Sequence, residues 1–166
     1  MLILCLHSLS FGTRPSFAEE MISDAGKKQP AETALLSQGR YLAKIAGCND
    51  CHTKGWITTN GNVSETEWLT GDDIGWWGPW GTTYPVNLRL FFQGITEETW
   101  ILIARTMQAR PPMPWYAIRE MKEEDLRAIY RFTRSLGPKG ENAPPYLPPA
   151  REPRPPYFRF VTPSSE

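Results

Sequence analysis

The sequence is short of cysteine, of histidine and of net charge. It holds three cysteines and two histidines among 166 residues, and Lys plus Arg equals Asp plus Glu at 18 each. Balanced charge excludes a field of one sign that would recruit nucleic acid, and three cysteines are too few for a disulfide framework. No apolar run approaches the roughly 20 residues of a membrane helix. What remains, at 40% hydrophobic and 22% charged residues, is the composition of one globular domain with tails.

The first residues are typical of a secretory signal. Residues 1–9 are apolar at all but two positions, and residues 16–18 (Ser-Phe-Ala) offer small side chains where a signal peptidase cuts. We therefore expect a signal peptide over 1–18, cleaved after Ala18. The apolar run lacks a preceding positive charge, which a true start upstream of Met1 would explain, and the alternative is a buried amino-terminal strand. Cleavage would remove Cys5 and His7, leaving one cysteine pair and one histidine.

The strongest motif is a close pair of cysteines followed directly by a histidine, Cys48-Asn49-Asp50-Cys51-His52. In c-type haem attachment, two thiols at this spacing add across the haem vinyl groups to form thioethers. The adjacent histidine is then held against the iron as its proximal ligand. The five-residue pattern is specific for haem attachment rather than for metal binding in general. It predicts one haem c bound covalently to Cys48 and Cys51, with His52 on the iron.

Three other uses of the cysteine pair fit the sequence less well. A zinc site needs about four ligands, and the chain offers no second Cys or His pair. A thioredoxin-type pair would follow a strand and open a helix, whereas a helical pattern precedes Cys48. A structural disulfide between residues three apart would be strained.

The segment before the motif predicts a helix over 32–46. Its apolar residues form a stripe at helical spacing, and Gly47 is well placed to end it. Gly39 falls in the middle, where glycine costs about 1 kcal/mol relative to alanine. Either another helix approaches closely at Gly39, or it is a tolerated surface glycine.

The second axial ligand must be something other than histidine, because His52 is the only one left after cleavage. The methionines after the motif are Met107, Met113 and Met121. Met113 stands in residues 110–115 (Arg-Pro-Pro-Met-Pro-Trp), where prolines forbid helix and stiffen an extended loop. A stiff loop suits a thioether, which bonds iron weakly. Met107 and Met121 fit better as packing residues, so we predict Met113, with a lysine, a water or an open site as alternatives.

Two more helices are expected downstream. Thr96 to Met107 begins with a capping threonine and two acidic residues, and its apolar side chains are too continuous for an exposed helix. Residues 122–136 place Leu126, Ile129 and Leu136 on one face at helical spacing.

Taken in order, these segments resemble the class I (mitochondrial-type) monohaem cytochromes c of bacteria over residues 32–137. The matching blocks are Gly39-Arg40-Tyr41, residues 48–52, residues 80–88 (Trp-Gly-Thr-Thr-Tyr-Pro-Val-Asn-Leu), residues 112–115 (Pro-Met-Pro-Trp), residues 125–130 (Asp-Leu-Arg-Ala-Ile-Tyr) and Ser135-Leu136. The later blocks are most similar to the haem subunits and domains that serve periplasmic alcohol and aldehyde dehydrogenases.

The resemblance implies an all-α fold packed around one haem. It implies that Cys48 and Cys51 bind the haem, that His52 is proximal and that Met113 is distal. It also implies that the helix near 35–46 crosses the helix near 122–136. Two departures stand out. Arg89-Leu90 replaces the usual threonine-proline turn, and Lys122 replaces a Ser or Thr cap, partly compensated by three acidic residues in the first turn.

The sequence divides into a signal peptide (1–18), a linker (19–31), the cytochrome domain (32–137) and a Pro-rich tail (138–166). Between the motif and Thr82 lie five of the seven tryptophans, which predicts an irregular lid over the porphyrin or ordinary anchoring of a loop. From Gly137 onward, nine of the sixteen prolines predict an extended tail. Its aromatic residues favour partial docking of the tail over a free linker.

The expected function is that of a periplasmic single-electron carrier and not of an enzyme. His/Met ligation raises the potential relative to bis-His, and a six-coordinate iron favours electron transfer over ligand chemistry. The expected partners are a donor dehydrogenase and an acceptor oxidase or reductase, met through a face of less than about 1,200 Å². One alternative is a haem subunit of a larger dehydrogenase or oxidase complex. Another is a haem enzyme or gas sensor with an open distal site near Arg110.

Overall fold

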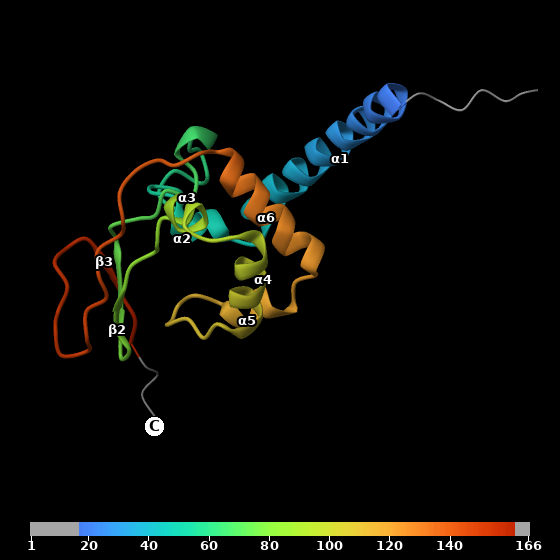
Figure 1. Ribbon diagram of the computed structural model, residues 1–166. Coiled ribbons are helices and arrows are strands. Elements are labelled where there is room, and N and C mark those ends of the chain that lie inside the picture. The colour runs from blue at the N-terminus through green and yellow to red at the C-terminus, as the bar shows by residue number, and fades with distance from the viewer. Residues whose placement is uncertain (1–16, 162–166) are drawn as a thin grey trace, which may run out of the picture. The chain divides into compact units, whose positions relative to one another are not determined.

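The computed structural model describes the backbone of residues 17–161 and the side chains of residues 31–161, and this part of the chain is mostly helical (Figure 1). The α-helices are α1 (Phe17–Ile45), α2 (Cys48–His52), α3 (Leu88–Gln93), α4 (Glu97–Thr106), α5 (Trp115–Glu120) and α6 (Glu123–Ser135). A 3₁₀ turn, η1, covers Glu65–Glu67, and the strands are β1 (Gly75–Gly78), β2 (Gly81–Thr83) and β3 (Tyr157–Arg159). The helical prediction is therefore confirmed, and a small sheet is added to it.

The expected signal peptide lies outside the described residues except for its last two, with which α1 begins, and the expected linker over 19–31 lies within α1. By its contacts the chain divides into two compact units between Thr33 and Ala34. The second unit carries every site discussed below. None of the helices within residues 17–161 combines the length and the apolar character that crossing a membrane requires.

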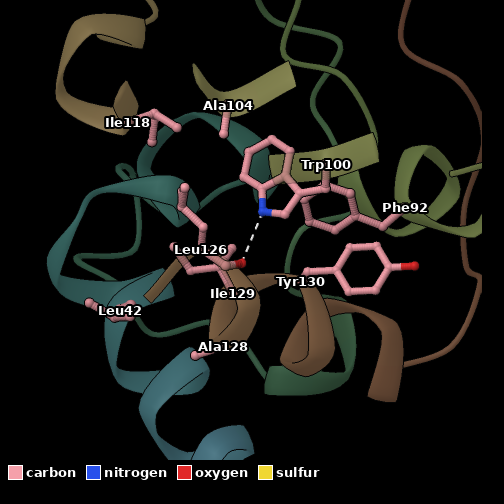
Figure 2. Packing of buried hydrophobic residues seen from close by; sticks show 9 residues of the cluster. All are labelled: Leu42, Phe92, Trp100, Ala104, Ile118, Leu126, Ala128, Ile129 and Tyr130. Carbon is pink, nitrogen blue, oxygen red and sulfur yellow. Dashed lines mark hydrogen bonds between the residues drawn. The ribbon is translucent and has the colours of Figure 1, made fainter. Parts of the chain in front are cut away.

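The main core joins five helices through nine buried side chains (Figure 2). These are Leu42, Phe92, Trp100, Ala104, Ile118, Leu126, Ala128, Ile129 and Tyr130. The Phe92 ring lies 4.9 Å from the Trp100 ring and 5.3 Å from the Tyr130 ring. Trp100 also donates from Nε1 to the Leu126 carbonyl at 2.9 Å, so its polar atom is paired inside the core. The buried helix expected around Trp100 is confirmed.

Gly39 is the point where α1 meets α6. A Cβ at this position would lie 2.0 Å from the carbonyl oxygen of Ala128 and 2.6 Å from Cβ of Phe132. No side chain fits in that space, so close helix approach is the correct explanation of the mid-helix glycine. The expected contact between this helix and the carboxy-terminal helix is confirmed.

The helix ends follow their local sequence. Gly47, two residues after the end of α1, adopts the left-handed conformation at φ 72°, which a residue with a Cβ rarely does. Thr96 caps α4 by accepting a hydrogen bond from the Thr99 N–H at 3.1 Å. Lys122 precedes α6 without a side-chain cap, and acidic residues fill the first turn.

The tryptophan-rich region contains ordered elements in place of an irregular lid. Trp56 and Trp68 pack edge to face at 5.3 Å within a second buried cluster. Strands β1 and β2 form an antiparallel hairpin, with Trp76 opposite Thr83. Aromatic and threonine residues favour strands, and the glycines of the hairpin sit at the ends of its strands. The expectation of an irregular segment is therefore wrong for residues 75–83.

The Pro-rich tail returns to this hairpin. Strand β3 pairs in parallel with β1, so the sheet order is β2-β1-β3. The Trp76 ring lies 4.9 Å from Phe158 and 5.8 Å from Phe160, and Tyr146 donates to the Trp80 carbonyl at 2.8 Å. The aromatic residues thus dock the tail, as their number predicts.

Arg89, a departure from the resemblance, is a buried structural residue. Its side chain is 5% exposed. Its guanidinium donates to the carbonyls of Gly137 at 2.5 Å, Thr66 at 2.9 Å and Leu136. A cation at the carboxyl end of α6 is favourable, so Arg89 ties that helix end to the loop before β1.

Replacing Arg89 with methionine should lower the free energy of unfolding by about 3 kcal/mol, because three carbonyls lose a charged donor. Urea unfolding, followed at two wavelengths, measures the shift of the midpoint. Arg151→Met, at an exposed position of the tail, is the control and should change stability by less than about 0.5 kcal/mol. Equal midpoints for the two variants would contradict this role for Arg89.

Candidate cofactor site

The predicted attachment residues lie together on α2. Gly47 reverses the chain after α1, and the single helical turn that follows carries Cys48, Cys51 and His52. Positions three apart in a helix share a face, so both thiols are presented on one side. Both cysteines are free. The structure thus shows unpaired thiols, not the structural disulfide considered above.

His52 is held in one tautomer by a backbone carbonyl. Its ring is buried at 7% exposure, and Nδ1 lies 2.7 Å from the carbonyl oxygen of Val86. A carbonyl can only accept, so Nδ1 carries the hydrogen and Nε2 keeps its lone pair. Burial lowers the pKa of His52, and the bond to Val86 opposes this only in part. A neutral imidazole with a fixed ring and a free Nε2 is the form that ligates metal.

The backbone around His52 is fixed by the segment before β1. The Gly71 N–H donates to the His52 carbonyl at 2.8 Å. Gly71 has φ +81°, and a Cβ there would come 2.9 Å from both the Pro85 carbonyl oxygen and the Asn87 nitrogen. Gly71 therefore lies in close contact between two segments of the protein, the one that contains His52 and the one that supplies the Val86 carbonyl. This packing sets the ring and its acceptor at hydrogen-bonding distance.

The two thiols are un-ionised at neutral pH. Burial is the main cause that raises the pKa of Cys48 to about 11 and that of Cys51 to about 11, and the charge of Asp50 adds to both. Cys48 packs against the second buried cluster. Cys51 borders a shallow hollow of about 20 Å³ that is partly open to solvent and is lined by residues of α2, β1 and β3, among them Trp76 and Phe158.

The structure places Met113 in a different segment from α2. It lies in the loop between α4 and α5 (Figure 1), partly buried against the main core, as Met107 and Met121 are. Met107 directly follows α4 and Met121 directly follows α5, whereas Met113 is the one of the three within the loop. Burial alone does not separate the three methionines, but the local backbone agrees with the loop expected for Met113.

The side chain of Arg110 contacts the carboxy-terminal tail. Its guanidinium carbon lies 3.9 Å from the centre of the Tyr146 ring, a cation–π contact. This contact speaks against Arg110 as a distal group above an open iron site.

Three buried hydrogen-bond donors on the hairpin have no partner. They are Nε1 of Trp80 and the hydroxyls of Thr82 and Thr83. Buried donors of this kind are costly unless something accepts from them. These three residues precede Val86 in the sequence by three to six positions, and the Val86 carbonyl accepts the hydrogen bond of His52. A bound group with oxygen acceptors, such as the propionates of a haem, is the kind of partner that these donors could take.

A zinc site gains no support from the described side chains. Among them, no group of three or more His, Cys, Asp and Glu residues is placed to hold a metal ion. His52, Cys48 and Cys51 are therefore the side chains of this site that could bind a cofactor or its metal.

Several functional features escape sequence reasoning. The Val86 carbonyl and the close contact at Gly71 depend on contacts between segments far apart in the sequence. The unpaired donors of the hairpin also need coordinates to be recognised. The only sequence signal for Val86 is its place in residues 80–88, one of the blocks of the resemblance.

Comparison with known proteins adds no relative. No family model, no curated protein and no solved structure matches this chain. The functional argument therefore depends on the geometry of α2 and its surroundings.

Proposed function

We propose that this protein is an exported single-electron carrier with one haem c, bound through Cys48 and Cys51 and ligated by His52 and Met113. The observation that carries the proposal is the hydrogen bond from Nδ1 of His52 to the Val86 carbonyl. His52 lies on α2, the same short helix as the two free thiols. This bond leaves Nε2 without a hydrogen, so that its lone pair is free to bind a metal ion. A haem bound there supplies an iron that changes by one electron.

Attachment needs no oxidant. Each thiol would add its sulfur to one vinyl carbon and its hydrogen to the other, so that one S–C and one C–H bond form while one S–H bond and the π bond of one vinyl C=C are lost. Two free thiols three positions apart on α2 are close enough in the chain to bind one ligand. The opening beside Cys51 gives one of them a route from solvent.

The chain's own residues would keep the iron site closed. His52 holds one axial position with a fixed ring, and Met113 in its proline-flanked loop supplies the other. A site with both axial positions filled has no place for a substrate, which favours electron transfer. The donors on Trp80, Thr82 and Thr83 would hold the propionates. Partners are then redox proteins of the periplasm, met transiently.

Met113→Ala should make the reduced protein bind carbon monoxide, whereas the unsubstituted protein should be insensitive to it. The reason is that removal of the thioether opens the sixth position of the iron. Visible spectra of the reduced protein, with and without carbon monoxide, measure this.

Met121→Ala is the matched control, because Met121 packs against the same core but outside the loop. It should remain insensitive to carbon monoxide. Binding by the unsubstituted protein, or a gain of binding in Met121→Ala and not in Met113→Ala, would overturn the proposed ligation.

A further inference from the structure

The loop that carries Met113 has few bonds of its own. Three of its residues are prolines, which have no N–H to donate. Its backbone bonds run from the Met113 N–H to Arg110 at 3.3 Å, from the Trp115 N–H to Met113 at 2.9 Å and from the Ala117 N–H to Pro114 at 3.0 Å. Proline rings stiffen the loop, but they do not fix where its two ends lie.

One side chain joins both ends of this loop. Arg119, on α5, donates from Nη2 to the carbonyls of Thr106 at 2.8 Å and Met107 at 2.6 Å, where α4 ends. Its guanidinium carbon also lies 4.4 Å from the centre of the Trp115 ring, where α5 begins. The contact is reinforced from the other side, because Arg105 of α4 donates to the Arg119 carbonyl.

We propose that Arg119 is a positioning residue for Met113, closing the loop 108–114 so that the thioether stays on the iron. This inference rests on the proposed function. A charged donor shared by two carbonyls at one end of the loop and an aromatic ring at the other fixes the span of the loop. A thioether is a weak ligand, so a loop free to open would lose it to competing molecules.

The same geometry separates this role from a merely structural one. The partners of Arg119 are helix-end carbonyls and the Trp115 ring, none of which belongs to the nine-residue main core. Loss of the guanidinium should therefore leave the packing of α4 on α6 intact and release the loop. The expected signature is a change in ligation together with a loss of stability no larger than that of Arg89→Met.

The test measures carbon monoxide binding to the reduced holoprotein. Arg119→Met should bind carbon monoxide at a rate at least about tenfold above the detection limit, below which the unsubstituted protein stays, since one charged hydrogen bond is worth at least that factor. Arg119→Lys, which keeps a charge but not the planar fork, should fall between the two. Arg134→Met is the matched control, because Arg134 also donates to a carbonyl, that of Phe92, and lies over an aromatic ring, that of Tyr130. It should behave like the unsubstituted protein.

A double variant isolates the route of the effect. If Arg119 acts through Met113, adding Arg119→Met to Met113→Ala should not change carbon monoxide binding further. An unsubstituted protein that binds carbon monoxide would defeat the proposed function itself. If neither the unsubstituted protein nor Arg119→Met binds carbon monoxide, only the proposed role of Arg119 is overturned. If Arg119→Met fails to accumulate, Arg119→Lys is measured in its place. An Arg119→Lys protein that does not bind carbon monoxide would overturn that role as well.

Discussion

Cys48→Ala/Cys51→Ala should give an exported chain that carries no haem after denaturation. The two thiols are the free cysteines of α2, and without them no thioether can form. His52 alone would leave the haem bound only by coordination, which denaturant removes. A denaturing gel stained for haem, beside an immunoblot of the same chain, measures the loss. We expect complete loss of the haem stain at the position of the protein band.

Cys5→Ala is the matched control for this experiment. Cys5 is the remaining cysteine and falls in the predicted signal peptide, so its removal should leave the haem stain unchanged. Haem that stays with the denatured double variant, or disappears in Cys5→Ala, would show that attachment does not use the α2 pair.

Gly39→Ala should lower the free energy of unfolding by about 3 kcal/mol, even though alanine gains about 1 kcal/mol in helix propensity. The added Cβ would lie 2.0 Å from the Ala128 carbonyl oxygen, and backbone cannot rotate out of the way as a long side chain can. The two helices must separate, which loosens the core around Leu42 and Leu126. Urea unfolding of the holoprotein, followed by tryptophan fluorescence, measures the effect.

Ser37→Ala, an exposed position two residues earlier on α1, isolates the contribution of propensity. It should leave stability within about 0.5 kcal/mol. If Gly39→Ala were as stable as Ser37→Ala, then α1 and α6 would not meet at this glycine as described.

The sequence predicts the helical part of the fold well, because its signals there are local. Thr96 as a cap, Gly47 as a helix end and the apolar face of α6 each depend on residues within a few positions. The sheet cannot be predicted in this way, because its pairing is not local. β1 pairs with β3, about eighty residues later, and no local pattern shows that a Pro-rich tail will supply a strand. Arg89 was likewise recognised only as a departure from a resemblance, since its acceptors come from distant segments.

In the candidate site, too, the sequence predicts the local features but not those that depend on contacts between distant segments. Cys48, Cys51 and His52 follow from a five-residue motif, and the structure places them on one helical turn. The carbonyl that fixes His52 comes from Val86, 34 positions away. The role of Arg119 depends on where α4 ends and α5 begins, which spacing alone does not show.

The most direct test of the central claim is the intact mass of the exported protein under denaturing conditions. Covalent haem predicts a chain heavier than the processed sequence by the mass of one haem, with no thiol left to alkylate. A mass equal to the sequence alone, or lower by two hydrogens from a disulfide between Cys48 and Cys51, would contradict the proposal that this protein is a c-type electron carrier.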